Sequence, residues 1–535
     1  MLPAVLTNAL HKWHKPSKYS VRVILTTCLA SLGGGLFGFD TGSIGAITEM
    51  HSFEEQFGVL TPTMRGVVVA IILLPSAFTG MLAGNIADKI SRKYSISVGA
   101  AIFAVGSALS AASTGDSLAM LLVGRCIAGL GEGLFLGCTG VYLTEISPRH
   151  LRSQAVLIMQ LYTTGAVALG FFVCYGTVNI PNSMGWRVPF IIQTFTATML
   201  AIGMPFVTYS PRWLISKGRI DEAKQVIDSL VAPDHDNEKR ELLAVPPAQL
   251  AARNKSQLEA MKDIWQPGVR GRTVLGVALN VFQQLSGIDF VLFFAPLLFN
   301  QAGLDPSTSS FIASGCTGLV LVACTYAGTF YIDRIGRRKI WIVGGTCTAT
   351  CHMVLGIFYA TGVPRLSEAG KYATIVFIEL FAVSFTSSWS IVTRLYAAEV
   401  QPTRTRAAAT SFGQGANQLA NFAVAVSGPA FLDRSSYSPY FFYGACTAIG
   451  VVFGYLYMHE VRGQTLESID ATFEGSAVAV SLPKVFRAAR LTQVRQRKNS
   501  RSQSATLPGE TRADLREHFK MDAIRETRDE SAVDD

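Results

Sequence analysis

Long stretches without any charged side chain restrict the fold of this 535-residue chain more than any other feature. The uncharged stretches are residues 66–87, 94–115, 153–186, 188–211, 306–332, 340–364, 407–432 and 435–459. Four further segments are equally apolar but carry one or a few charges: residues 23–47, 117–144, 273–300 and 372–398. Each is long enough for a helix that crosses a hydrocarbon core, which takes roughly 20 residues. The sequence therefore predicts an all-α membrane protein with twelve transmembrane helices.

The composition argues against a soluble protein or an enzyme. Charged residues make up 16% of the chain, whereas an average soluble domain carries roughly 25%. The nine cysteines lie mostly inside the predicted spans, without the paired spacing of a disulfide framework or zinc site. The sequence shows no metal-ligand cluster, nucleotide-binding loop or nucleophile triad. We therefore expect neither an enzyme nor a bound cofactor or metal.

Basic residues indicate the orientation in the membrane. Residues 1–22 contain basic but no acidic residues, and no cleavable signal is apparent. The short loops at 88–93, 149–152 and 333–339 are also basic. Because positive loops stay inside, we expect these loops and both termini to be cytosolic. The net charge of +9 then predicts contact with the lipid bilayer and not with nucleic acid.

A charged segment at residues 212–272, with helical signals, divides the spans into six and six. We therefore predict five parts. They are a cytosolic N-terminus (1–22), a first six-helix bundle (23–211), a cytosolic helical linker (212–272), a second six-helix bundle (273–459) and a largely disordered cytosolic tail (460–535).

Two charged motifs occur once in each half, at spacings of 245 and 254 residues. Their charged members are Asp88, Arg92, Glu145 and Arg152 in the first half and Asp333, Arg337, Glu399 and Arg406 in the second. Parallel six-span repeats build one class of transporter, with the substrate site between the halves. We expect these carboxylates and arginines to pair across the halves when the cytosolic side is closed. Several pairs are needed because an exposed pair contributes only about 0–1 kcal/mol.

Nine short motifs follow one another in a fixed order. They lie at residues 38–40, 88–93, 124–125, 142–152, 210–214, 283–288, 333–338, 396–406 and 460–467. In this order, over about residues 20–475, they resemble the sugar porters of the major facilitator superfamily. The resemblance implies a twelve-helix carrier whose halves rock around a central substrate. It is similar to fungal plasma-membrane members, so we expect a plasma-membrane protein, and a monomer.

The resemblance also implies where the substrate binds. Gln160, Gln283 and Gln284 match glutamines that bind sugar hydroxyls, and Asn417 and Asn421 match further binding positions. Amides suit a polyol because each offers donors and an acceptor. Without the family match, each amide could equally well bond to a neighbouring helix.

Three residues in this pocket depart from the family pattern. Arg394 and Gln418 stand where hexose porters have tryptophans, and Asp289 stands where they have an asparagine. A guanidinium in the bilayer interior costs at least about 2.5–3.5 kcal/mol unless it is paired or solvated. The partner is either a substrate carboxylate, which a guanidinium binds with two parallel hydrogen bonds, or Asp289. A third explanation is that Arg394 lies nearer the cytosolic interface.

Further charged residues lie inside the spans. Asp40 occupies a position that is acidic in the family's proton symporters, and Arg125 matches its usual partner; the alternative is a static buried pair. Glu132 lies seven residues after Arg125, where an apolar residue is usual. It is either a second proton site or a helix–helix contact, and this choice stays open. Glu379 aligns with Arg125 in the second half and is a weak candidate.

These features together predict proton-coupled uptake of a hydroxylated organic acid by alternating access. A sugar acid such as D-galacturonate is the favoured substrate, because its carboxylate would neutralise Arg394 while its hydroxyls meet the amides. Within transport, the alternatives are quinate and a neutral hexose or pentose. An alternative of another class is a sugar sensor that binds without transporting.

Overall fold

The computed structural model describes residues 18–114, 118–147, 149–230, 257–304, 309–402 and 405–462. Within these ranges the side chains of residues 18–22, 149–153, 257, 258, 260, 329, 332 and 333 are not described. Most of the predicted N-terminal segment, the middle of the predicted linker and the tail from residue 463 lie outside the described residues. The regular structure that is described consists of helices.

The first half holds six long helical segments. In chain order they are α2 (Lys18–Ile47), α4 (Pro62–Ala70) with α5 (Leu73–Ile90), α6 (Arg92–Ala111), α7 (Ala119–Ile146), α8 (Arg149–Thr177) and α9 (Met184–Gly203). Short elements connect them or follow them: α3 (His51–Phe57), the 3₁₀ turn η1 (Met204–Phe206), α10 (Pro211–Ser216), α11 (Ile220–Leu230) and α14 (Gln257–Asp263).

The second half repeats this arrangement. Its helices are α15 (Arg270–Leu285) with α16 (Ile288–Phe293) and α17 (Ala295–Gln301), α18 (Ser309–Ile335), α19 (Arg337–Thr361), α20 (Val363–Leu366), α21 (Glu368–Thr386) with α22 (Trp389–Glu399), α23 (Arg406–Arg434) and α24 (Ser438–Tyr457). Eleven helical segments of the described chain are long and apolar enough to cross a membrane. The remaining long helix, α23, carries several amides, which lower its hydropathy. Every predicted span falls on a helix, so the predicted twelve-helix fold is confirmed.

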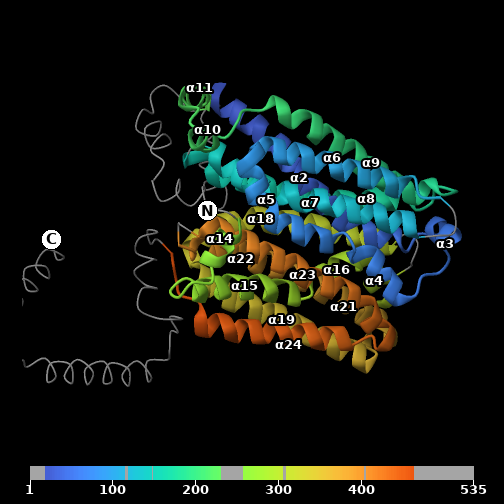
Figure 1. Cartoon of the computed structure of the whole chain (residues 1–535). Coiled ribbons are helices and arrows are strands. Elements are labelled where there is room, and N and C mark those ends of the chain that lie inside the picture. Colours follow the sequence, from blue (N-terminus) through green and yellow to red (C-terminus); the bar gives the residue numbers. More distant parts are fainter. Residues whose placement is uncertain are drawn as a thin grey trace, which may run out of the picture. The chain divides into compact units, whose positions relative to one another are not determined.

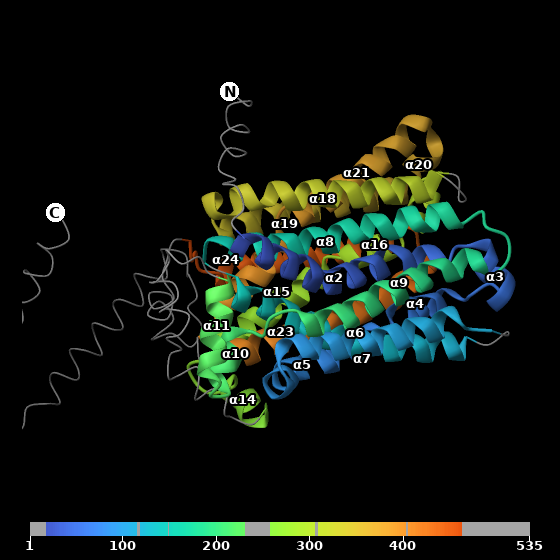
Figure 2. The same ribbon diagram turned by 90° about the horizontal axis from the view of Figure 1, so that it is seen from above.

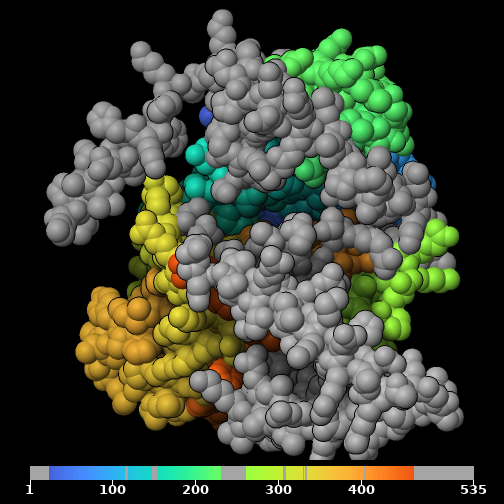
Figure 3. All heavy atoms as spheres, turned by 90° about the vertical axis from the view of Figure 1, so that its left-hand side faces the viewer, coloured from blue at the N-terminus to red at the C-terminus, as the bar shows by residue number. Residues whose placement is uncertain are grey.

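The helices form two bundles that pack against each other. In the first bundle α7 packs on α5 and α6, and α2 packs on α8; in the second α19 packs on α21 and α24, and α15 packs on α23. Between the bundles, α8 packs on α18, and α4 and α5 pack on α23. We call the end with α10, α11 and α14 the linker end and the opposite end, with α3, the α3 end (Figures 1 and 2). Figure 3 looks onto the linker end.

Three spans are broken inside the membrane-length segment: between α4 and α5, between α15 and α16, and between α21 and α22. At the second break Gly287 has φ 77°, a left-handed conformation that glycine adopts readily. Nε2 of His352 in α19 lies 2.8 Å from the carbonyl oxygen of Ser286 and donates to it. Such breaks are tolerated in a membrane where protein groups satisfy the freed backbone. This break places Gln283, Gln284 and Asp289 around one bend.

A strained residue joins α5 to α6, and its replacement yields a first prediction. Ser91 has φ 89° and ψ 157°, a region essentially restricted to glycine that costs about 1–3 kcal/mol. Its counterpart in the second half is Gly336, with φ 101°. We expect Ser91→Gly to raise the apparent melting temperature in detergent, because glycine adopts this backbone conformation without the strain. The loss of the Ser91 Oγ contact to the Tyr94 amide costs only a few tenths of a kcal/mol. A lower or unchanged melting temperature contradicts this.

Candidate functional site

Asp40 of α2 and Arg125 of α7 form a buried ion pair with two parallel hydrogen bonds. Arg125 Nη1 donates to Asp40 Oδ1 at 3.0 Å and Nη2 donates to Oδ2 at 3.1 Å. Nη2 also donates to the Val69 carbonyl at 2.8 Å. Gln193 of α9, which sequence reasoning missed, donates to Asp40 Oδ1 at 3.2 Å. A lone amide in an apolar span was the available signal for Gln193. The pair thus links α2, α4, α7 and α9.

Three of the predicted amides form one hydrogen-bonded cluster in the second bundle. Gln284 Nε2 donates to Asn417 Oδ1 at 3.0 Å, and Asn417 Nδ2 donates to Gln283 Oε1 at 3.1 Å. Asn421 follows one turn later on α23 and is fully buried. Neither amide atom of Asn421 has a hydrogen-bond partner among the described residues, and the same holds for Gln284 Oε1. Because a buried polar atom without a partner costs about 1–3 kcal/mol, this cluster suits a polar ligand.

Arg394 of α22 faces the first bundle. Its Nη1 donates to Oε1 of Gln160 in α8 at 3.2 Å, so this contact crosses between the bundles. Arg394 is exposed although it lies within a membrane-length helical segment. The buried carboxylate of Asp289 attracts it electrostatically. No direct ion pair joins these two described side chains, so the structure does not form the Arg394–Asp289 pair that was one explanation of this arginine.

A tryptophan near Arg394 does not replace the missing aromatic residue of the pocket. Trp389 begins α22, is fully buried and stacks on Trp341 with ring centroids 4.0 Å apart. Its Nε1 donates to the Trp341 carbonyl at 2.9 Å. Trp389 is therefore held inside the second bundle by Trp341.

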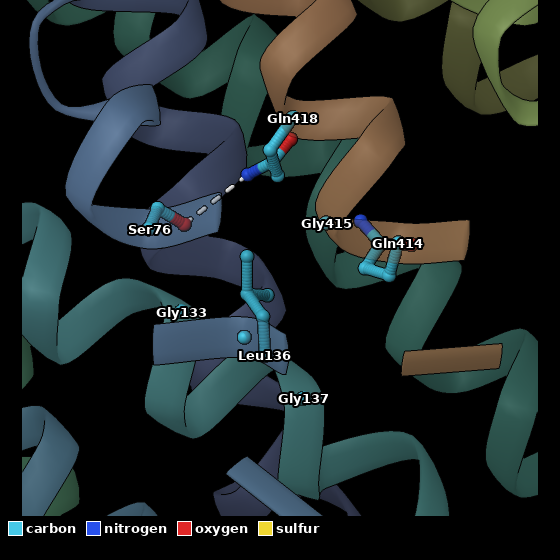
Figure 4. A pocket seen from close by; sticks show the side chains of 8 residues that line it. Ser76, Gly133, Leu136, Gly137, Gln414, Gly415 and Gln418 are labelled. Atoms are coloured by element: carbon cyan, nitrogen blue, oxygen red, sulfur yellow. Dashed lines mark hydrogen bonds between the residues drawn. The ribbon is translucent and has the colours of Figure 1, made fainter. Parts of the chain in front are cut away.

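Gln418 lies apart from the amide cluster. Its Nε2 donates to Ser76 Oγ of α5 at 3.2 Å, the contact drawn in Figure 4, and lies 3.4 Å from Glu132 Oε1 of α7. Ser76 was missed by sequence reasoning and donates to the same Glu132 oxygen at 3.1 Å. Glu379 lies elsewhere and accepts a hydrogen bond from Thr317 at 2.5 Å, within the second bundle.

The charged motifs at the linker end form ion pairs within each bundle. Arg92 lies 2.6 Å from Asp88 and 3.0 Å from Glu145, measured between nitrogen and carboxylate oxygen. In the second bundle Arg337 lies 3.1 Å from Glu399. These pairs tie the ends of α5, α6 and α7, and of α19 and α22, to each other.

The other charged residues of these motifs give no information on ion pairs between the two bundles. Arg406 Nη2 donates to the Gln401 carbonyl at 3.0 Å. The side chains of Arg152 and Asp333 are not among those that the structure describes. Pairing across the bundles in a closed state stays a prediction.

At the α3 end the backbones of the two bundles touch. A Cβ atom on Gly45 of α2 would lie 1.5 Å from the carbonyl oxygen of Phe293 in α16. A Cβ atom on Gly66 of α4 would lie 2.5 Å from the carbonyl oxygen of Val426 in α23. Only glycine permits such approaches. The bundles are therefore closed against each other at this end.

Known proteins share both the sequence pattern and the fold. A family model for "Sugar (and other) transporter" matches residues 26–473. The chain is 30% identical over 485 residues to a high glucose sensor, RGT2, of Saccharomyces cerevisiae, covering 87% of this chain and 62% of that one. It is 28% identical over 481 residues to a "Probable quinate permease" of Neosartorya fischeri, covering 86% and 89%.

Among solved structures, the proton:xylose symporter XylE bound to 6-bromo-6-deoxy-D-glucose has a TM-score of 0.70. Its sequence identity is 24%, and the match covers 85% of this chain and 100% of that chain. This likeness shows the major facilitator fold. The family match over most of the chain adds that the protein is a transporter and not an enzyme. The chain therefore belongs to the sugar porter family of the major facilitator superfamily.

Proposed function

We propose that the protein imports a hydroxylated monocarboxylic acid together with protons, by alternating access between the two bundles. The substrate class is a sugar acid such as D-galacturonate. Arg394 carries this proposal: it faces the other bundle, bonds to the neutral Gln160 and has no ion-pair partner among the described side chains. A guanidinium in such a place binds a carboxylate through two charge-assisted hydrogen bonds.

The amides supply the complementary half of the site. Each offers two donors and an acceptor carbonyl, which suits hydroxyl groups that donate and accept in turn. The unpartnered atoms of Asn421 and Gln284 support this assignment, because a hydroxylated ring would satisfy them. Asp289 interacts electrostatically with Arg394. This attraction would orient the guanidinium toward the substrate.

Two other substrates are alternatives for the same residues. Quinate is a ring acid with hydroxyl groups, and the relative named as a quinate permease supports it as the second acid. A neutral hexose or pentose would fit if Asp289 paired with Arg394 in another state of the transport cycle. The direct pair is not formed in this structure, so the acid is favoured.

A sensor that binds sugar without carrying it is the alternative from another class. The glucose sensor among the relatives supports it, although this chain covers only 62% of that protein. The complete Asp40–Arg125 pair favours transport, because a protein that only binds has no need of a proton-coupled ion pair.

Proton coupling is assigned to Asp40 and Arg125. A buried ion pair is stable while both charges are present, and removing one charge leaves the other uncompensated. Protonation of Asp40 would therefore release Arg125 and free α2 and α7 to move. In this proposal the linker end is cytosolic by the positive-inside rule, the protein is a plasma-membrane monomer, and the closed α3 end faces outward.

The test of the substrate class is Arg394→Ala. We expect uptake of D-galacturonate to fall about 10- to 100-fold, because a hydrogen bond to a charged group contributes about 1.5–3 kcal/mol. Arg394→Lys should give an intermediate loss, since lysine keeps the charge and lacks the planar fork. Uptake of radiolabelled galacturonate, glucuronate, quinate and glucose at two pH values measures both effects.

Arg365→Ala is the matched control, because Arg365 is exposed in α20 outside the spans. Unchanged acid uptake by Arg394→Ala would overturn the acid assignment. Competition by glucose or xylose with little effect of the acids would favour the neutral-sugar alternative. Binding without flux in proteoliposomes would favour the sensor.

A further inference from the structure

We propose that Glu132 is a second proton-binding site, placed at the contact between the bundles, that carries one additional proton in each transport cycle. This inference rests on the proposed proton-coupled transport and concerns a residue outside the Asp40–Arg125 pair. Its basis is the position of Glu132 between three helices and the hydrogen bonds that it accepts.

Glu132 is fully buried in the middle of α7. Its Oε1 accepts hydrogen bonds from Ser76 Oγ at 3.1 Å and from Gln418 Nε2 at 3.4 Å. Its Oε2 has no partner among the described residues. Both donors are neutral. Oε1 can accept both bonds in either protonation state, and Oε2 is the oxygen left to carry a proton.

No cation of the described residues forms an ion pair with Glu132. The charged groups that act on Glu132 are Asp40 of α2 and Arg125 of its own helix. Arg125 is already held by Asp40 and by the Val69 carbonyl. On α6, the neighbouring residues are Gly99 and Phe103, which approach Gly131 next to Glu132. An ionised carboxylate without a partner at this depth costs several kcal/mol, so Glu132 is neutral in this conformation.

The contact of Glu132 crosses the surface along which the bundles move. Glu132 and Ser76 belong to the first bundle, whereas Gln418 belongs to α23 of the second. When the bundles move apart here, Glu132 loses the hydrogen bond from Gln418 and water reaches the carboxyl group. Hydration then stabilises the ionised form of Glu132, and the carboxyl group can lose its proton. Proton binding at Glu132 is thus linked to the closed contact, as any ligand is linked to the state that binds it better.

A small cavity beside this contact leads toward the linker end. Its volume is about 10 Å³, which is room for about one water molecule. Gly80, Gly133, Gly137 and Gly415 line it together with Ser76 and Gln418 (Figure 4). Relative to the Glu132 contact, these glycines lie toward the linker end, because α5 and α7 run to that end and α23 starts there. A water molecule in this cavity could accept the Glu132 proton on that side of the contact.

The experiment measures the ratio of protons to substrate in proteoliposomes, with an internal pH dye and radiolabelled D-galacturonate. Two titrating carboxyls predict about two protons per substrate for the wild type and about one for Glu132→Gln. With a monoanionic substrate, wild-type uptake is then accompanied by an inward current, and uptake by the Gln variant is electroneutral. If the substrate panel identifies glucose instead, labelled glucose replaces the acid and the same difference of one proton is expected.

Two further variants serve as controls. Glu132→Asp keeps a carboxyl group and should keep the wild-type ratio. Glu379→Gln removes a carboxyl that, among the described residues, bonds to Thr317 of its own bundle, and it should also leave the ratio unchanged. A wild-type ratio of one, or equal ratios in the wild type and Glu132→Gln, would overturn the second site. A wild-type ratio of one overturns the second site even if the Gln variant does not fold, and a ratio of two assigns it to Glu132 only together with a variant that folds. Absence of any substrate-driven proton flux in the wild type would instead overturn the proposed function.

Discussion

Asp40→Asn is expected to remove the proton coupled through the Asp40–Arg125 pair and to lower proton-driven accumulation of substrate strongly, while leaving exchange of substrate across the membrane intact. Asparagine has nearly the same shape and still accepts a hydrogen bond from Arg125, but it cannot take up or release a proton. The buried Arg125, which is 1% exposed, then has no titrating partner. Accumulation against a gradient at acidic outside pH, and counterflow without a pH gradient, measure the two activities in the same proteoliposomes.

The matched control is Asp221→Asn. Asp221 lies in α11 with a side chain that is 95% exposed, and it contacts only Lys224 in the described structure, at 3.6 Å. Exposed pairs of this kind contribute about 0–1 kcal/mol, so both activities should stay at the wild-type level. Accumulation by Asp40→Asn at the wild-type level would show that the Asp40–Arg125 pair is static and takes no part in proton coupling.

Gly45→Val is expected to reduce net uptake to background while substrate binding remains. A Cβ atom at this position would lie 1.5 Å from the Phe293 carbonyl oxygen and 2.6 Å from the carbonyl carbon, so α2 and α16 could no longer approach as they do here. The α3 end could not close. A carrier that alternates between two closed ends stops when one end stays open, whereas the substrate site remains accessible. Uptake assays and equilibrium binding of labelled substrate separate the two effects.

Gly176→Val controls for the substitution itself. Gly176 lies near the α3 end of α8, and a Cβ atom there would meet nothing within 4 Å. It should transport like the wild type. Normal uptake by Gly45→Val would show that closure at the α3 end does not depend on this close approach.

The spans could be predicted from the sequence because the property that defines them is local. A helix crosses the bilayer when about 20 successive residues are apolar, whatever its neighbours are. The breaks inside spans were not predicted. The break at Gly287 depends on His352, which reaches the Ser286 carbonyl from α19, and on Tyr443, whose ring would lie 2.7 Å from a Cβ at this position. Contacts between distant segments of this kind leave no local signal.

The candidate site was predicted in part. The resemblance selected Asp40 and Arg125, and the geometry brings them together. It also selected Gln283, Gln284 and Asn417, which share one hydrogen-bonded cluster. Motif matching assigned Gln418 to the same pocket, yet its amide bonds to Ser76 and Glu132. Neighbouring residues on a helix point about 100° apart, so Asn417 and Gln418 serve different surfaces.

The sequence by itself determined that the chain spans a membrane, how many spans it has, that its two halves repeat, and which charged residues lie inside the spans. These are properties of composition and order along the chain, and hydrophobic burial enforces them wherever the helices lie. Only the tertiary structure decided which of the charges meet. It brought Asp40 to Arg125, Arg394 to Gln160 and Glu132 to Gln418, because hydrogen bonds and ion pairs act over a few ångströms between residues that are far apart in sequence.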